Sequence, residues 1–412
     1  MSLKQFRRRA GGIGLGVLLA LAAMPACAAD NEKSFEVYGF AQLDYIQDFG
    51  RVDPDWEDAL RPSRIPTDKD AFGDDGQASF SVKQTRLGVK ASVPTSGGPI
   101  NTRFEFDMFG VGEDAGKTTI RLRHAYGEFG QFLAGQTHSL FMDIDIFPNT
   151  IDYWGPAGMV FLRTPQIRWT PIANERSSLA VALENPSNDI DPGQYREAAD
   201  FPGVQGDQEY PDLTVQYRMK GDWGHVQLAG ILRWIGAEVI GDKDPGPAED
   251  LGVIYDDHDT GWGIDLTSVI NVLERDAIRA GIVFGDGIAS YMNDGGMDAG
   301  PDRGLVAGQL PGGTQIEAVQ LTGLSLYYDH WWNDRFSSSA GYSYTEVDNT
   351  AGQTADTFEK GSYASANLLY YPVENVMVGA ELLWGQREDF GGADNDDTRI
   401  QVSFKYNFGT KL

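Results

Sequence analysis

The chain has 412 residues, of which 33 are basic and 60 acidic, giving a net charge of −27 at neutral pH. So strong an acidic excess argues against a nucleic-acid-binding protein, which must neutralise phosphates with Lys and Arg, and we expect no nucleic-acid partner. The single cysteine, Cys27, excludes an internal disulfide framework. Apart from residues 10–29, no stretch has the roughly 18–20 consecutive apolar residues that a spanning helix needs.

The N-terminus has the three parts of an export signal. Lys4 and Arg7–Arg9 supply positive charge, residues 11–24 are mostly apolar, and Ala26 and Ala28 form a small-residue cleavage motif. We predict a signal peptide at residues 1–28 and one domain at residues 29–412. Removing the signal changes the net charge from −27 to −31. Lipidation of Cys27 is the less favoured alternative, because Met-Pro-Ala is a poor approach to a lipidated cysteine.

From residue 35 onward the sequence alternates with a period of two, which is typical of β-strands. For example, Ile100, Thr102, Phe104 and Phe106 alternate with polar residues. The runs are long enough to cross a hydrocarbon layer as tilted strands, which takes about 9–11 residues. We predict sixteen strands, at residues 35–48, 78–94, 100–110, 119–129, 131–136, 166–173, 177–185, 211–220, 223–238, 260–273, 276–291, 318–332, 335–348, 358–373, 375–389 and 397–408.

The connections between these strands alternate strictly in length. Seven are tight turns and eight are longer, mostly polar segments, so both termini lie on the short-turn side. Aromatic pairs such as Tyr327-Tyr328 and Trp331-Trp332 lie near strand ends, where interfacial girdles form. A soluble all-β protein is the alternative, but no repeat of about 40 residues recurs as a propeller would require.

A sheet that spans lipid must close, because an open edge would leave backbone polar groups unsatisfied. We therefore predict an all-β fold, a 16-stranded antiparallel transmembrane β-barrel of the porin type. Its expected place is the outer membrane of a Gram-negative bacterium, where outer-membrane lipid and lipopolysaccharide surround it.

Signals for catalysis or cofactor binding are weak. Gly116-Lys117-Thr118 resembles the end of a phosphate-binding loop, but Val111 replaces the required glycine and the segment joins two strands. There is no G-x-S-x-G elbow, and the five histidines lack metal-ligand spacing. We expect that the protein is not an enzyme and that it binds no cofactor. The acidic runs 256–259 and 394–397 have oxygen ligands for Ca²⁺ or Mg²⁺, although such runs are more often solvated loops.

Positive charge is concentrated in residues 83–123. If the apolar residues of each strand face lipid, the arginines and lysines between them face a lumen on adjacent strands. Lumen arginines set ion selectivity and engage both oxygens of a carboxylate. The candidate substrate-binding residues are Arg86, Lys90, Arg103, Arg121 and Arg123, with Arg163 and Arg168 beyond them.

Residues 137–165 are too apolar to extend into water. We predict that they form an inward-folded constriction loop in which Asp143 and Asp145 face the basic wall. The favoured function is passive uptake of small organic anions through this constriction. The alternatives are a non-selective general diffusion porin and a phosphate- or sugar-selective porin, with Tyr38 and Phe40 as a short stacking track for a sugar.

Four segments resemble the DcaP-like outer-membrane porins: AFGDDGQASFSVKQTRLGVKA at residues 71–91, RLRHAYG at 121–127, LAGQTHSLFMD at 133–143 and DYWGPAG at 152–158. The resemblance implies a homotrimer of sixteen-stranded barrels that takes up small anionic solutes, dicarboxylates and aromatic carboxylates included. It assigns the cationic site to Arg86, Lys90, Arg103, Arg121 and Arg123. The chain departs from the family at its C-terminus, where four residues follow Phe408 although such barrels normally end on an aromatic residue.

Overall fold

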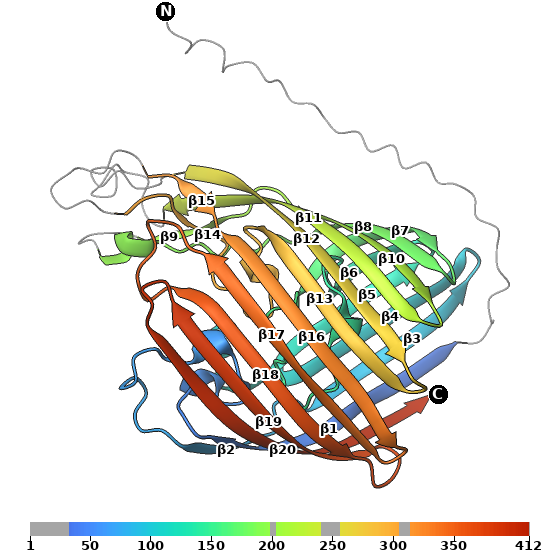
Figure 1. Cartoon of the computed structure of the whole chain (residues 1–412). Coiled ribbons are helices and arrows are strands. Elements are labelled where there is room, and N and C mark those ends of the chain that lie inside the picture. Colours follow the sequence, from blue (N-terminus) through green and yellow to red (C-terminus); the bar gives the residue numbers. More distant parts are fainter. Residues whose placement is uncertain (1–32, 198–202, 240–255, 305–313, 412) are drawn as a thin grey trace, which may run out of the picture.

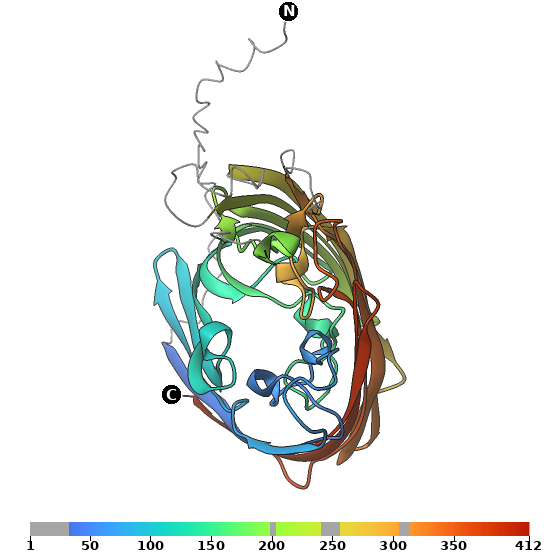
Figure 2. The same ribbon diagram turned by 90° about the vertical axis from the view of Figure 1, so that its left-hand side faces the viewer.

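The computed structural model describes residues 33–197, 203–239, 256–304 and 314–411. The predicted signal peptide and Cys27 lie outside these residues. The main sheet has 18 strands, of which β2 (Gln77–Ser81) pairs only with β1 (Ser34–Asp48), and β9 (Val204–Asp207) only with β11. The other sixteen form a closed antiparallel ring within the described residues, because β1 pairs with both β3 and β20 (Figures 1 and 2). The predicted 16-stranded barrel is confirmed.

The ring continues in chain order. Its other strands are β3 (Arg86–Thr95), β4 (Gly98–Phe109), β5 (Thr118–Phe129), β6 (Phe132–His138), β7 (Arg163–Ala173), β8 (Ser177–Glu184), β10 (Asp212–Gly221), β11 (Gly224–Val239), β12 (Asp256–Val272), β13 (Asp276–Asp286), β16 (Gln320–Asn333), β17 (Phe336–Asp348), β18 (Phe358–Tyr370), β19 (Val376–Asp389) and β20 (Asp394–Lys411). A separate two-stranded sheet joins β14 (Ala299–Pro301) to β15 (Ile316–Ala318).

The helical segments are short 3₁₀ turns. They are η1 (Pro54–Trp56), η2 (Pro62–Arg64), η3 (Gly112–Asp114), η4 (Ile144–Ile146), η5 (Gly193–Glu197) and η6 (Ala289–Tyr291). No helix among the described residues is both long and apolar enough to span a membrane. The 3₁₀ turns lie in the long connections, which gather at one end of the barrel, whereas tight turns join the strand pairs at the other end (Figure 1).

The predicted strand at residues 78–94 is wrong in one respect, because the chain breaks it into β2 and β3. Residues 82–85 form a turn in which Thr85 N donates to Val82 O at 3.0 Å. The break turns two polar side chains inward. Lys83 pairs with buried Asp58, and Gln84 donates to Ile151 O at 2.9 Å. The predicted strand at 276–291 likewise ends at Asp286 and continues into η6.

The two faces of the strands are inverted relative to a soluble protein. Phe104 on β4 is 50% exposed toward the lipid side, whereas the neighbouring Glu105 is only 1% exposed. Apolar residues outside and charged residues inside are the pattern of a membrane barrel. The alternation also corrects the expected aromatic girdle, since Tyr328 faces out but its neighbour Tyr327 is buried inside and receives a hydrogen bond from Ser365.

Residues 139–162, between β6 and β7, fold into the barrel as predicted (Figure 2). Phe141 and Met142 of this constriction loop pack against inward-facing apolar residues of β11 and β13, including Ile231 and Val283. Burying them inside the barrel removes their apolar surface from water. The loop therefore fills the side of the lumen formed by β11 and β13.

Candidate functional site

Five arginines lie on the opposite side of the lumen, on four of the five strands from β3 to β7. We call this set the arginine wall: Arg86 on β3, Arg103 on β4, Arg121 and Arg123 on β5, and Arg163 at the start of β7. The strand register places Arg86 opposite Asp107 and Asp107 opposite Arg121. Inward-facing side chains of neighbouring strands are therefore in contact. Two carboxylates, Glu105 and Asp107, lie between the arginines.

Glu105 holds three of the arginines. Its oxygens lie 2.6 Å from Arg103, 2.8 Å from Arg123 and 3.6 Å from Arg86. The Tyr38 hydroxyl also donates to Glu105 at 2.7 Å. The two shorter contacts are charge-assisted hydrogen bonds, which hold the guanidinium groups of Arg103 and Arg123 in fixed orientations. Arg86 is attracted by the charge of Glu105 without a hydrogen bond to it.

Asp107 forms ion pairs with two arginines of the wall. It lies 2.6 Å from Arg121 and 2.8 Å from Arg123, and its side chain is fully buried. Tyr153 of the constriction loop donates its hydroxyl to Asp107 at 2.8 Å and accepts from Arg123 at 2.9 Å. The loop thus touches the wall through the phenol of Tyr153, and the ring of that phenol stacks on Phe109 at 4.0 Å.

The wall carries an excess of positive charge. Its five arginines face two carboxylates, a balance of +3. Arg163 forms no ion pair with any described residue, and its Nη1 is buried without a hydrogen-bond partner. Its guanidinium instead lies 5.2 Å from the ring of Phe161. An uncompensated lumen cation attracts anions across the channel.

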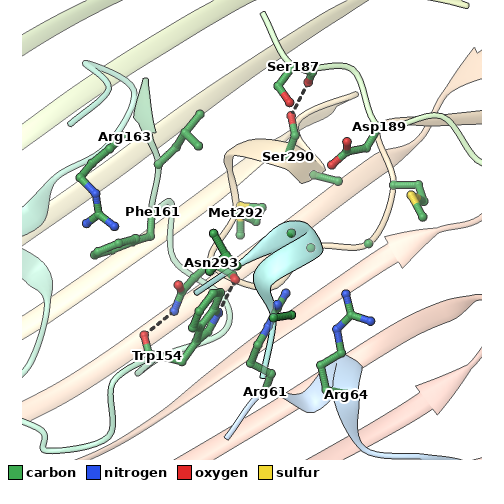
Figure 3. A pocket seen from close by; sticks show the side chains of 18 of the residues that line it. Arg61, Arg64, Trp154, Phe161, Arg163, Ser187, Asp189, Ser290, Met292 and Asn293 are labelled. Carbon is green, nitrogen blue, oxygen red and sulfur yellow. Dashed lines mark hydrogen bonds between the residues drawn. The ribbon is translucent and has the colours of Figure 1, made fainter. Parts of the chain in front are cut away.

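Two cavities meet the wall from opposite ends. The larger, of about 1100 Å³, is the vestibule on the loop side, and Arg121 and Arg163 line it together with Arg61 and Arg64 of the segment between β1 and β2 (Figure 3). The smaller, of about 280 Å³, is lined by Arg103, Lys90 and Lys411 near the tight turns. Cations thus line both spaces and the wall between them.

Two predicted residues lie beside the wall rather than in it. Lys90 pairs with Glu36 at 3.7 Å and lines the smaller cavity. Arg168 on β7 donates to Gln166 at 3.0 Å and to the carbonyl of His138 at 2.7 Å. Both side chains face inward, but neither makes an ion pair with Glu105 or Asp107.

The prediction that Asp143 and Asp145 face the basic wall is wrong. Asp143 accepts from Arg218 at 2.5 Å, from His225 at 2.7 Å and from Thr267 at 2.8 Å, and Asp145 also pairs with Arg218. These partners belong to β10, β11 and β12. The reason is the apolar packing of the two preceding loop residues, which fixes this arm of the loop on the far side of the lumen.

Three of these groups have the composition of a metal site. The ligand atoms of Asp143, Asp145 and His225 lie within 4.8 Å of one another. However, the Arg218 guanidinium already binds both carboxylates and supplies the positive charge that a metal would bring.

The acidic runs at residues 256–259 and 394–397 already accept hydrogen bonds. Asp259 accepts from Ala318 N at 2.9 Å, and Asp397 accepts from Gly50 N at 2.7 Å. A Ca²⁺ or Mg²⁺ ion at either run stays a prediction.

Sequence reasoning missed several residues of the site. Glu105 and Asp107 share the inward face of β4 with Arg103, so the period of two contained the signal for their role. Tyr153, Arg61 and Arg64 lie in non-periodic connections. No pattern in the sequence indicates which wall such side chains reach.

A closed 16-stranded barrel with charged residues in its lumen and an inward-folded loop defines an outer-membrane porin, a channel of Gram-negative bacteria rather than an enzyme. The sequence profile of the DcaP outer membrane protein family matches residues 23–245, more than half of the chain. The protein therefore belongs to the DcaP outer membrane protein family, and the resemblance seen in the sequence is confirmed.

Solved structures agree on the fold. The outer membrane channel DcaP of Acinetobacter baumannii has a TM-score of 0.75 and 22% identity, over 93% of this chain and 100% of that one. The anion-selective porin from Comamonas acidovorans has a TM-score of 0.54 and 10% identity, over 92% and 100% of the two chains. The trimer form of OmpT of Vibrio cholerae has a TM-score of 0.52 and 12% identity, over 91% and 99%. No curated protein matches the chain significantly.

Proposed function

We propose that this porin mediates the passive uptake of small organic anions, in particular dicarboxylates and aromatic carboxylates. The observation that supports the proposal is the arginine wall, in which five guanidinium groups face two carboxylates. A solute moves down its gradient, and the excess positive charge raises the local concentration of anions at the constriction. A similarly folded porin from Comamonas acidovorans is anion-selective, in line with the proposal.

Carboxylates fit this wall better than the other anions considered. Arginine presents a planar fork that engages both carboxylate oxygens, whereas lysine acts as a point charge. The wall contains five arginines, and Lys90 beside it is the neighbouring lysine, so a lysine ladder for phosphate is not favoured. Trp154 and Phe161 line the vestibule and offer faces to a planar aromatic solute.

The sugar alternative finds little support at Tyr38 and Phe40. Lys90 Nζ lies 4.4 Å from the ring centre of Tyr38, and Lys405 Nζ lies 3.9 Å from that of Phe40. The Arg86 guanidinium also lies 5.1 Å from the ring centre of Phe40. Cations over a ring occupy the face that a sugar would need.

We also infer a homotrimer. A structural neighbour, OmpT of Vibrio cholerae, occurs in a trimer form. On this chain, β1 and β20 pair over thirteen residues and present exposed apolar side chains such as Phe35, Leu43 and Phe404 on the outer surface. In lipid, helices and strands associate through packing of such surfaces rather than through the hydrophobic effect.

The decisive test is the reversal potential of the purified channel in a planar bilayer with a salt gradient. We expect the sign that corresponds to anion preference, and we expect succinate or phthalate to block the chloride current in a concentration-dependent way. A reversal potential near zero would favour the general diffusion porin, and the opposite sign would refute the proposal.

A further inference from the structure

Three loops that are far apart in the sequence meet over the vestibule. Arg61 and Ser63 come from the segment between β1 and β2, Trp154 comes from the constriction loop, and Asn293 and Asp294 follow β13. Figure 3 shows Arg61, Trp154 and Asn293 of this set. We call these five residues the three-loop clasp. None of them belongs to the arginine wall.

Arg61 is the centre of the clasp. Its guanidinium carbon lies 4.2 Å from the ring centre of Trp56 and 4.3 Å from that of Trp154, two indoles that contact each other edge to face with ring centres 4.9 Å apart. The edge of the same group donates to Asp294 Oδ1 from Nη2 at 2.9 Å and from Nε at 3.2 Å. Asp294 is almost fully buried and also accepts from Ser63 N at 2.8 Å. The guanidinium therefore lies against the corner formed by the two indoles and binds Asp294 through one edge.

The constriction loop is bound to the third loop by reciprocal hydrogen bonds. Trp154 donates Nε1 to the carbonyl of Asn293 at 2.6 Å, and Asn293 donates Nδ2 to the carbonyl of Trp154 at 2.7 Å. Asn293 Nδ2 also donates to the carbonyl of Pro156 at 2.9 Å. The position of Trp154 is thus set by the clasp from both its ring and its backbone.

Trp154 directly follows the residue that touches the arginine wall. Tyr153 places its hydroxyl between Asp107 and Arg123, at 2.8 and 2.9 Å. A displacement of Trp154 must move Tyr153 as well, because the two residues share a peptide bond. Loosening the clasp would therefore detach the phenol from the wall and let the constriction fluctuate.

We propose that Arg61 is a positioning residue of the channel, which keeps the constriction in one open geometry through its planar guanidinium. The proposal concerns the steadiness of the open channel and is independent of the anion preference proposed above. Lysine cannot replace arginine in this role, since a compact ammonium group offers neither the planar fork that binds Asp294 through two nitrogens nor a flat group that reaches both indoles at once.

The test is single-channel recording of the purified full-length barrel in planar bilayers. For Arg61→Ala we expect at least about a tenfold rise in the frequency of partial closures, because one partner of a buried ion pair is removed. We expect Arg61→Lys to keep the wild-type reversal potential but to close nearly as often as Arg61→Ala. Asp294→Ala should have the same effect as Arg61→Ala, and the double variant should be no worse than either single one.

Lys69→Ala is the control, because it removes a positive charge from the same segment between β1 and β2. Lys69 is exposed, does not line the vestibule and makes no ion pair with any described residue. Its channel should be as steady as the wild type. The proposal would be overturned if Arg61→Ala and Asp294→Ala closed no more often than the wild type. It would also be overturned if the Arg61→Lys channel closed as rarely as the wild type. If Arg61→Ala does not assemble, Asp294→Asn provides the same readout with the side-chain volume kept.

Discussion

Arg163 differs from the other four arginines of the wall because no described carboxylate pairs with it. Arg86, Arg103, Arg121 and Arg123 are each held by Glu105 or Asp107, so removing one of them changes a hydrogen-bonded network as well as the charge. Breaking a buried ion pair costs more than the lost attraction, since it leaves the remaining charge unpaired. The individual arginines are therefore unequal targets for a test of selectivity.

We expect Arg163→Gln to lower the anion-to-cation permeability ratio without loss of stability. A unit charge about 5 Å from an ion in water contributes about 0.8 kcal/mol, which corresponds to about a fourfold change in the ratio at low salt and less at high salt. The measurements are the reversal potential and the unfolding temperature. By contrast, Arg121→Gln with Arg123→Gln removes both ion-pair partners of Asp107 and should destabilise the barrel by about 3–5 kcal/mol. An unchanged reversal potential in Arg163→Gln would contradict this assignment.

Asp189 gives the vestibule a dependence on pH. Partial desolvation of its carboxylate, together with the nearby charge of Asp298, raises the pKa of Asp189 to about 6. The carboxylate is therefore charged at about pH 7.5 and neutral at about pH 5. Acidification removes a negative charge from the anion path, so anion preference should rise over this interval. Asp189→Asn should show the higher preference at both pH values, and an equally steep profile in this variant would assign the effect to another group.

The constriction loop is attached on three sides of the lumen. Asp143 binds Arg218 on β10, Ile151 N donates to Glu381 on β19 at 2.5 Å, and Tyr153 reaches Asp107 on β4. The loop is thus a crossbar with separate attachments rather than a flap with one hinge.

The attachment at Asp143, which precedes η4, should be stronger than that at Asp145, which lies within η4. Its side chain is 0% exposed and binds three groups, whereas the Asp145 side chain is 54% exposed. We expect Asp143→Ala to cost about 3–5 kcal/mol and Asp145→Ala at most about 1 kcal/mol. Heat-dependent conversion of the folded barrel on a denaturing gel measures the difference, and equal effects of the two variants would refute it.

The sequence predicted the regular elements because their pattern is local. Alternation along β4 and β5 indicated that Arg103, Arg121 and Arg123 face inward, and the register of neighbouring strands then brought them together. The position of Asp143 was predicted wrongly, because in a loop the side chain follows the packing of its neighbours. The three residues that bind Asp143 lie on β10, β11 and β12, which are 75, 82 and 124 residues further along the chain. No local rule specifies such contacts.

Charge is distributed unevenly over the molecule. The chain has a net charge of −27, yet the wall on β3 to β7 carries an excess of three positive charges. The long loops hold much of the acidic residue content. Because the field in the lumen depends on nearby groups more than on distant screened ones, the proposed anion preference rests on the wall rather than on the net charge.

We expect the inferred trimer to form through the outer surface of β1 and β20, but Gly39 on β1 is not free to take part in this contact. A side chain at Gly39 would meet the Phe408 ring at 2.8 Å, so this glycine is already covered within one chain. Ala41 and Leu43 remain exposed beside it. We expect native mass measurement to return three copies in mild detergents. Monomers alone in several detergents would contradict the inferred trimer.

The crossbar also has a consequence for the order in which the protein assembles. The loop leaves β6 early in the chain, but Glu381, which receives Ile151 N, is 230 residues further on. Contacts of such sequence separation form late, because the intervening chain must first be ordered. The pairing of β20 with β1 that closes the barrel spans a longer separation still, since Asp48 lies opposite Arg399. The crossbar therefore receives its attachment at Glu381 only once β19 has joined the sheet, close to the step that closes the barrel. We expect a chain that ends before β19 to leave this part of the loop unattached.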